Sequence, residues 1–528
     1  MDPEKAAQEN KGLSLLKAGR KGVLSIVFSR MAIIVLLLAL QVLALFGVFR
    51  WFGDFLPHIF GGTVLFSVAM VLYLLNSRLD ASAKLTWLLV ITLLPVFGAL
   101  MYLFTQSDLG HRTLRNRAAD MMEQTKDLLT TPAGTMERLE QQAPGAASLT
   151  RYLDRCGSFP VYENTAVTYF PLGEKKFEEL LRQLEQAERF IFLEYFIVDE
   201  GLMWGRILEI LARKAARGVD VRVMYDGTCE LSTLPRDYPK RLRKLGIRCK
   251  PFAPIAPFVS THYNYRDHRK ILVIDGHTAF TGGVNLADEY INRIVKHGHW
   301  KDTAVMLQGE AARSFTLMFL QMWNLDEKTP DFSIVSEIPA AASPKAEGFV
   351  IPYGDCPVDA DHVGEQVYID ILNRAQKYVH IMSPYLILDG ELESALTFAA
   401  KRGVDVRLIL PGIPDKSFPY ALAFTHYPAL LDAGVKIGEY TPGFVHAKVF
   451  VSDDAEAVVG TINLDYRSLY HHFECAAYLR DVPCIPQIQE DFEDTWSKCR
   501  MVTRESIRKG SFSRWLCGVV LKPLAPLM

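Results

Sequence analysis

The sequence has almost no excess charge and few cysteines. Its 58 lysines and arginines nearly balance 60 aspartates and glutamates, for a formal net charge of −2, whereas general nucleic-acid binders are usually basic. The 8 cysteines are scattered and show neither CxxC pairs nor Cys/His ligand spacing. This pattern disfavours disulfides and zinc and favours a reducing compartment. No nucleic-acid partner, metal or other cofactor is expected.

Charge is absent from three apolar runs near the N-terminus, residues 31–49, 59–75 and 85–104. Each is about the length that spans a bilayer, so residues 31–104 are expected to form a membrane region of transmembrane helices, after a basic tail over residues 1–30. Pro95 lies inside the third run, where a membrane tolerates a kink. One alternative is a signal peptide for the first run, which is long for one and lacks a cleavage site. Another is a buried core hairpin.

Basic residues flank the membrane region on both sides. Arg112, Arg115 and Arg117 directly follow the third run, and the positive-inside rule places that side in the cytoplasm. The same rule places the basic N-terminal tail in the cytoplasm as well, although three spans would put the two ends of the membrane region on opposite sides. We expect a multi-pass protein of the cell membrane whose catalytic part is cytoplasmic. The charge of the tail then stays unexplained, and the number of spans, two or three, stays open.

One stretch of the remaining chain, residues 268–275, carries reactive residues at the start of an apolar strand pattern. Read as a strand, it places His268 and Lys270 on one face at the polar mouth and Asp275 on the other face. Asn285 follows a Gly-Gly turn, where the chain can come back beside that mouth. An imidazole, an ammonium and an amide at one spot suit a phosphate, with one nucleophile and two donors to its oxygens.

The motif occurs twice, which distinguishes it from the surface His-Lys pair that is common on strands. The second copy has the same spacing and consists of His446, Lys448, Asp453 and Asn463. Three flanking segments also align, residues 189–196 with 377–385, 217–222 with 402–407, and 245–247 with 433–435. Helical stretches lie between these expected strands. The alternation is typical of an α/β fold with a mixed sheet.

We therefore expect two similar α/β halves, each a mixed sheet flanked by helices, placed face to face so that both motif sets share one cleft. The expected parts are a helical linker over 105–160, a first half over 161–337, a Pro/Ala/Ser-rich linker over 338–347, a second half over 348–500 and a C-terminal tail over 501–528. The tail is short and apolar. It either lies on the bilayer surface or packs against the catalytic core.

The duplicated HxKxxxxD pattern with its downstream GxxN resembles the phospholipase D superfamily over residues 162–496. The segment 76–95 and its apolar flanks resemble the membrane hairpin of bacterial cardiolipin synthases. The resemblance implies that one motif histidine attacks phosphorus, giving a phosphohistidine, while the other protonates the leaving glycerol and later deprotonates the incoming alcohol. Family precedent favours His268 as nucleophile and His446 as acid and base. The internal symmetry leaves that assignment open.

The resemblance also implies supporting roles. Four residues would hold the phosphate oxygens: Lys270, Lys448, Asn285 and Asn463. Asp302 and Glu474 occupy the places downstream of each motif where family members carry the carboxylate that orients a catalytic histidine. Asp275 and Asp453 belong to the family's active-site set. Strand parity turns these two away from the cleft, so they are interpreted as structural.

The leading hypothesis is a cardiolipin synthase, a phosphatidyltransferase that joins two phosphatidylglycerol molecules at the bilayer and releases glycerol. The alternatives are a phospholipase D-type hydrolase or a transferase with another alcohol acceptor, because no motif encodes the acceptor. A nuclease is disfavoured by the apolar runs, and an inactive scaffold by the two intact motifs. The other histidines near the motifs lack ligand spacing and are expected in cleft walls or at the surface: His262, His297, His299, His471 and His472.

Overall fold

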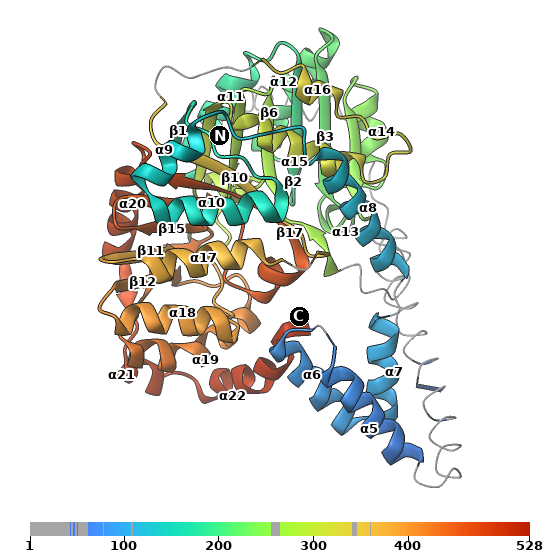
Figure 1. The fold of residues 1–528 in the computed structure, drawn as a ribbon, viewed down its shortest axis with the longest axis vertical. Coiled ribbons are helices and arrows are strands. Elements are labelled where there is room, and N and C mark those ends of the chain that lie inside the picture. Colours follow the sequence, from blue (N-terminus) through green and yellow to red (C-terminus); the bar gives the residue numbers. More distant parts are fainter. Residues whose placement is uncertain are drawn as a thin grey trace.

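The structure, a computed structural model, describes residues 62–77, 79–106, 109–254, 264–339, 346–359 and 361–527, with four isolated helical positions between 43 and 50. The basic tail over 1–30, most of the apolar run over 31–49, and His262 lie outside the described residues. Figure 1 shows two α/β halves stacked in one body, with helices α5, α6 and α7 beside it, near the C-terminal end.

The first half is built on a seven-stranded sheet in the order β1-β9-β7-β6-β2-β3-β4. Strands β2, β3 and β4 are parallel, and the remaining pairs are antiparallel. The strands are β1 (Thr165–Phe170), β2 (Phe190–Tyr195), β3 (Asp220–Asp226), β4 (Arg248–Phe252), β6 (Lys270–Ile274), β7 (Thr278–Gly282) and β9 (Ala304–Gly309). The helices are α11 (Gly173–Leu184), α12 (Leu202–Ala216), α13 (Cys229–Ser232), α14 (Tyr238–Arg243), η3 (Asp288–Ile291), α15 (Ala312–Asn324) and α16 (Ser333–Ser336).

The second half repeats this arrangement in the order β10-β17-β16-β15-β11-β12-β13-β18. Strands β11, β12 and β13 are parallel and the others antiparallel. The strands are β10 (Phe349–Asp355), β11 (Tyr378–Met382), β12 (Asp405–Pro411), β13 (Lys436–Tyr440), β15 (Val449–Ser452), β16 (Glu456–Gly460), β17 (His472–Arg480) and β18 (Cys499–Met501). The helices are α17 (Val363–Arg374), α18 (Gly390–Lys401), α19 (Ser417–Ala433), η4 (Arg467–His471) and α20 (Ile485–Ser497). The expected α/β fold of two similar halves with mixed sheets is confirmed.

Both faces of each sheet are buried, as the apolar strand sequences require. In β2, Phe190 and Phe192 point into a core that α15 and the second half share. Their neighbours Ile191 and Leu193 point to the opposite face, under α11 and α12. Alternate side chains therefore serve two cores, which is the normal reason for an unbroken apolar run in a parallel strand. The shared core fixes one half against the other.

Each half also contributes a short strand that pairs with a strand of the other half. Strand β5 (Arg266–Asp267) of the first half pairs with the start of β17. Strand β14 (Gly443–Val445) of the second half pairs with β8 (His299–Lys301) of the first. Both exchanged strands directly precede a motif histidine. The exchange therefore brings each motif to the boundary between the halves.

The membrane region differs from its prediction. The run over 85–104 is not one helix but a hairpin of α6 (Ala81–Leu93) and α7 (Pro95–Gln106), with α5 (Gly62–Leu75) packed against it. The rings of Trp87 and Tyr102 lie 5.3 Å apart, whereas one continuous helix would separate them by about 22 Å. Pro95 cannot continue α6, and Gly98 allows the second helix of the hairpin, α7, to approach Val90 closely. The expectation of a single kinked span was therefore wrong. Within the described residues, no helix has both the length and the apolar character needed to cross a bilayer.

The linker and tail helices cover the body. Helices α8 (Leu109–Thr125), α9 (Thr135–Gln142) and α10 (Pro144–Gly157) occupy the predicted helical linker, and α10 packs on α17. The tail forms α21 (Arg504–Arg508), α22 (Phe512–Leu521) and η5 (Lys522–Leu527). Helix α22 rests on α19 through Gly518, while Trp515 and Val520 stay exposed. It packs against the core on one side and leaves an apolar face open on the other.

Candidate active site

The two motif histidines are held at the boundary between the halves by backbone hydrogen bonds. The N–H of His268 donates to the carbonyl of Phe473 at 3.0 Å, and the N–H of His446 donates to the carbonyl of Lys301 at 2.7 Å. The predicted strand over 268–275 therefore begins at Lys270, two residues late. Its first residues pair with the opposite half instead of continuing β6. Both imidazoles are buried, with 6% and 7% of their residue surface exposed.

Each histidine is oriented by a carboxylate from the other half. Nδ1 of His268 lies 2.8 Å from Oε1 of Glu474, and Nδ1 of His446 lies 2.7 Å from Oδ2 of Asp302. Both carboxylates are fully buried. With Nδ1 occupied, Nε2 is the nitrogen that each ring offers to a substrate. The site is thus built from two crossed pairs, and neither half alone contains a complete pair.

The two pairs differ in charge. Burial alone would raise the pKa of Asp302, but His446 and Lys448 outweigh it and hold that pKa below its ordinary value. Burial raises the pKa of Glu474 well above its ordinary value. Burial also lowers the pKa of His446 to about 4. Burial, with the nearby lysines and His472, holds the pKa of His268 well below its ordinary value. The surroundings therefore favour the ionised form of Asp302 and the neutral form of both imidazoles, and they disfavour the charged form of Glu474.

The motif lysines occupy equivalent places. Nζ of Lys270 donates to the carbonyl oxygen of His268 at 2.6 Å, and Nζ of Lys448 donates to that of His446. Burial lowers the pKa of Lys270 to about 8 and that of Lys448 to about 7. The two ammonium groups repel each other in one buried site, and the ionised Asp302 offsets only part of their charge. They form a receptor for an anion such as a phosphodiester.

The motif asparagines follow tight turns. Oδ1 of Asn285 accepts from the N–H of Ile197 at 3.1 Å, and its Nδ2 donates to the hydroxyl of Tyr290 at 2.8 Å, which leaves one amide N–H for a ligand. The buried Oδ1 of Asn463 has no hydrogen-bond partner among the described residues. A Cβ on Gly283 would lie 2.0 Å from Oδ1 of Asp302, so only glycine fits at this turn.

Asp275 and Asp453 end their strands and face away from the histidines. Asp275 accepts hydrogen bonds from the backbone N–H groups of residues 188, 189 and 190 at 2.8, 2.7 and 2.8 Å. Asp453 does the same for residues 376, 377 and 378 at 2.7, 2.9 and 2.9 Å. Both have positive φ, 54° and 53°, a conformation that Asp tolerates better than most residues. These contacts tie each motif strand to the start of its neighbour.

Aromatic rings surround the histidines, and of these only His472 was expected from the sequence, in a cleft wall or at the surface. The ring of Trp300 lies 5.5 Å from that of His446, and the ring of His472 lies 5.2 Å from that of His268. Trp300 and His472 each stand two residues before the orienting carboxylate, so aligning the two halves could have revealed their equivalence. Phe196, with its ring 4.9 Å from His268, gave no such signal.

His472 is the third buried imidazole of the site. Arg467 donates to its Nε2 at 3.2 Å, so Nδ1 carries the proton. That proton has no hydrogen-bond partner in the described part of the chain, the nearest acceptor being Oε1 of Glu474 at 3.6 Å. Of the other histidines near the motifs, His297, His299 and His471 are partly exposed.

Donor atoms of three residues, His268, His472 and Glu474, lie within 4.8 Å of one another and could surround a metal ion. Two histidines and a glutamate are a ligand set that zinc accepts. However, Nδ1 of His268 and Oε1 of Glu474 already share a hydrogen bond. A metal at this place would have to break the contact that orients His268.

Comparison with known proteins agrees with this geometry. A family model described as "Cardiolipin synthase, PLD-like domain" matches residues 180–323 and 368–496, and one described as "Phospholipase_D-nuclease N-terminal" matches residues 65–105. A cardiolipin synthase of Geobacillus kaustophilus is 34% identical, over 95% of this chain and 99% of that protein. The chain belongs to the cardiolipin synthase family. The two ranges matched by the family model contain both HxK motifs and both orienting carboxylates.

Two further comparisons concern one relative in sequence and one in structure. An uncharacterized protein of Streptococcus mutans serotype c is 57% identical, over 87% of this chain and all of that protein. The crystal structure of a phosphatidylserine synthase from Haemophilus influenzae superposes with a TM-score of 0.55 at 14% identity, over 75% of this chain and 100% of that chain. The structural likeness shows that the two-half fold is shared.

Proposed function

We propose that this member of the cardiolipin synthase family transfers a phosphatidyl group from one phosphatidylglycerol to another, giving cardiolipin and glycerol, through a phosphohistidine on His268. The observation that carries the proposal is the pair of crossed contacts, His268 with Glu474 and His446 with Asp302. They supply two oriented imidazoles to one buried site, which is what a double displacement at phosphorus requires.

In the first step, Nε2 of His268 attacks phosphorus and the bond to the glycerol oxygen breaks. His446 delivers a proton to that oxygen, so the leaving group departs as neutral glycerol. His446 suits the acid role because its partner Asp302 is ionised and stabilises an imidazolium. His268 suits the nucleophile role because its surroundings keep the ring neutral. The anionic phosphodiester supplies the negative charge that raises the proton affinity of His446 when substrate binds.

In the second step, neutral His446 takes the proton from a hydroxyl of a second phosphatidylglycerol. The hydroxyl oxygen attacks phosphorus and the P–N bond to His268 breaks, which restores the enzyme. One phosphodiester bond is broken and one is formed, so the exchange needs neither nucleotide nor other energy source. Lys270, Lys448 and the free amide N–H of Asn285 hold the nonbridging oxygens in both steps.

The membrane supplies both substrates. We place the protein at the cell membrane through its N-terminal apolar segments, including residues 31–49, with the two halves on the cytoplasmic side. Arg112, Arg115 and Arg117, directly after the third run, support this side. A site held at the lipid surface meets a second lipid hydroxyl more often than a soluble alcohol. This proximity favours lipid transfer over other acceptors.

The reaction can be tested with the full chain in detergent, given phosphatidylglycerol and a chelator but no CTP or CDP-diacylglycerol. We expect cardiolipin and glycerol in equal amounts, and excess glycerol should reverse the reaction. His268→Ala and His446→Ala should each lose at least about 10³-fold in rate, the scale of a covalent or acid–base partner. Phosphatidic acid as main product would replace the transferase by a hydrolase, and a strict need for CDP-diacylglycerol would exclude the scheme.

A further inference from the structure

A cavity of about 1060 Å³ lies apart from the motif residues, between the second half and the tail helices. It is bounded by α18, α19, α22, η5 and the start of α6. Neither motif contributes a histidine, lysine or asparagine to its lining. Its volume is at the upper end of the range for ligand pockets, about 300–1,000 Å³. The proposed transfer reaction makes no use of this space.

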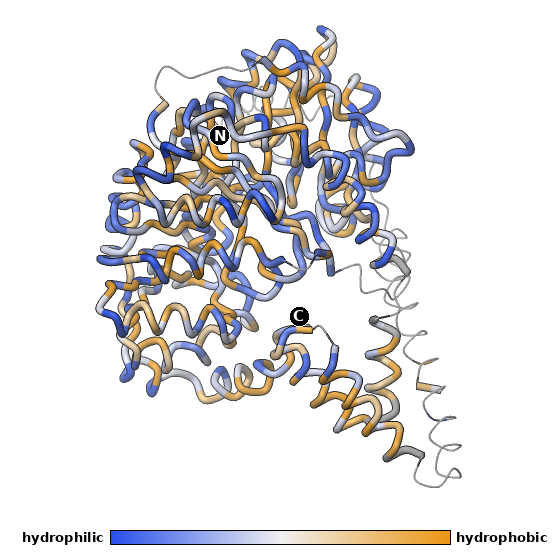
Figure 2. The backbone as a smooth tube through the Cα atoms, in the orientation of Figure 1, coloured by the Kyte–Doolittle hydropathy of each residue, from blue (hydrophilic) through white to orange (hydrophobic). Residues whose placement is uncertain are grey.

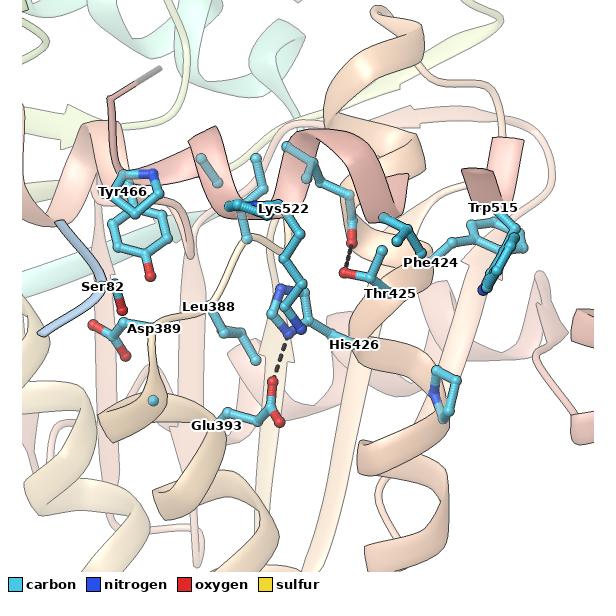
Figure 3. Close-up of a pocket in the computed structure, with 18 of the residues that line it drawn as sticks. Ser82, Leu388, Asp389, Glu393, Phe424, Thr425, His426, Tyr466, Trp515 and Lys522 are labelled. Atoms are coloured by element: carbon cyan, nitrogen blue, oxygen red, sulfur yellow. Dashed lines mark hydrogen bonds and ion pairs between the residues drawn. The ribbon is translucent and has the colours of Figure 1, made fainter. Parts of the chain in front are cut away.

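The lining combines an apolar wall with one charged group of residues (Figure 3). Leu388, Phe424 and Trp515 form part of the apolar wall. Beside Leu388, Nδ1 of His426 lies 2.6 Å from Oε2 of Glu393, and His426 is only 2% exposed. A buried, hydrogen-bonded imidazole in a mainly apolar cavity is an arrangement that orients a ligand with a polar end.

Lys522 adds a positive charge to this polar end. Lys522 and His426 both line the cavity, and Figure 3 shows the two side chains beside each other. Burial lowers the pKa of His426, and the ammonium of Lys522 lowers it as well. The carboxylate of Glu393 is already committed to His426. Asp389 accepts from the N–H of Leu392 and the hydroxyl of Tyr470. With both carboxylates engaged, Lys522 is the cation beside His426 that can receive an anion, and Arg508 is the other basic residue of the lining.

The rim of the cavity continues into an exposed apolar surface. Leu85, Phe512 and Trp515 line the cavity, and 67%, 72% and 51% of their surfaces are exposed. Helix α5 adds further exposed apolar residues, Leu65, Val68, Leu72 and Leu75, and Figure 2 shows helices α5 to α7 as a mainly hydrophobic group beside the C-terminal end. Thr86 of α6 donates to the carbonyl of Pro523 in η5 at 2.5 Å. This bond joins the apolar helices α5 to α7 to the tail helices at the rim of the cavity. An exposed apolar patch of this kind with a Trp at its edge is typical of contact with lipid.

We propose that the cavity binds one anionic glycerophospholipid from the bilayer, with an acyl chain between Phe424 and Trp515 and its phosphate at Lys522. This site is separate from the catalytic cleft and does not depend on turnover. It borders the second motif through Tyr466, which lines the cavity three residues after Asn463. The lipid would thus fasten the tail helices and the second motif loop to the membrane surface.

The test is native mass spectrometry of the delipidated full chain in detergent, with phosphatidylglycerol as probe and phosphatidylcholine as the neutral comparison. Thr397→Trp fills the cavity from α18, and Ala429→Trp puts the same side chain at an exposed place on α19 outside the lining. We expect Thr397→Trp to bind one lipid fewer, or at least about tenfold more weakly. Ala429→Trp should bind as the unmodified chain does.

Two further variants separate the charge and the location of the site. Lys522→Gln should remove the preference for phosphatidylglycerol over phosphatidylcholine, and it tests the site even if Thr397→Trp folds poorly. His268→Ala should keep the bound lipid, because binding here needs no chemistry. Unchanged binding in a folded Thr397→Trp, equal affinity for both lipids in the unmodified chain, or loss of the lipid in His268→Ala would each overturn the proposal. None of these results depends on whether cardiolipin is made.

Discussion

The two motif histidines have the same hydrogen-bonded geometry but different neighbours. His446 is paired with an ionised carboxylate, and its ring lies 5.5 Å from the tilted indole of Trp300. His268 is paired with a carboxyl group whose pKa is raised, beside the additional imidazole of His472. A symmetric sequence motif has thus acquired an asymmetric electrostatic environment. This asymmetry is the physical basis for giving the two histidines different steps.

The asymmetry predicts unequal effects of two isosteric substitutions. Asp302→Asn removes a charge that supports the imidazolium of His446, so turnover should fall at least about 10²-fold. Glu474→Gln keeps an oxygen that can accept from Nδ1 of His268 and removes a charge that burial already disfavours, so turnover should fall by less than about tenfold. Steady-state kinetics on both variants, with melting curves to confirm folding, would measure the difference. Equal losses would show that the two carboxylates carry the same charge.

The lysines predict the alkaline side of the pH profile. Lys448 and Lys270 lose their protons as the pH rises through about 7 and 8, well below the ordinary lysine range, because burial disfavours the ammonium form. The empty site then loses the charge that binds the phosphodiester. We expect kcat/KM to fall as the pH rises through 7–8, since this ratio reports groups of the free enzyme. A ratio that stays constant up to pH 10 would contradict the lowered lysine pKa values.

Most of the site residues were predictable from the sequence, but their pairing was not. The repeated spacing identified His268 and His446, and the positions of Asp302 and Glu474 followed from the resemblance. Which carboxylate serves which histidine depends on two short strand pairs between the halves. Strands of two or three residues leave no periodic pattern in a sequence.

At the scale of elements, the ends of the motif strands act as structural ties. Asp275 and Asp453 each bind three consecutive backbone N–H groups at the start of the neighbouring strand. Asp275 is buried, whereas Asp453 is partly exposed and two of its three bonds face solvent. The same contact should therefore be worth more in the first half than in the second.

This difference predicts the outcome of matched substitutions. Asp275→Asn should destabilise the protein by about 1–3 kcal/mol, because it leaves the buried N–H of Phe190 and two partly buried N–H groups poorly satisfied. Asp453→Asn should cost less, because water can replace the lost acceptor. Folded protein of either variant should retain most of its turnover. Thermal melting and activity on the same samples would show both effects. A stable but inactive Asp275→Asn variant would assign the residue to the chemistry.

Regular elements with strong apolar patterns were predicted well, and the exceptions have local causes. The aligned segments around residues 189–196 and 377–385 contain β2 and β11. The apolar run over 85–104 carries no signal that tells one span from a hairpin, because hydropathy does not record chain direction. Pro95 begins α7, and Gly98 lets that helix pack closely on Val90, which becomes visible only in the folded chain.

At the scale of the whole molecule, the catalytic body should lie in the cytoplasm. Ser497 is exposed at the end of α20, while Cys229 is only 2% exposed. In intact cells, Ser497→Cys should not react with a membrane-impermeant maleimide, and it should react once the cells are opened. Cys229 serves as the buried control that reacts in neither case. Labelling of the engineered cysteine in intact cells would place the body on the outer side.

The site is complete only when both halves are present, because each half supplies a histidine to one pair and a carboxylate to the other. The proposed mechanism follows from this exchange and requires a covalent intermediate on one particular histidine.

Trapping that intermediate is the most direct measurement. The full chain is mixed with phosphatidylglycerol labelled in its phosphate, quenched in alkali within the first turnovers, digested and analysed by mass spectrometry. We predict that the label is on the peptide containing His268 and absent from the peptide containing His446. Label on His446, or product formation with no labelled histidine, would contradict the mechanism.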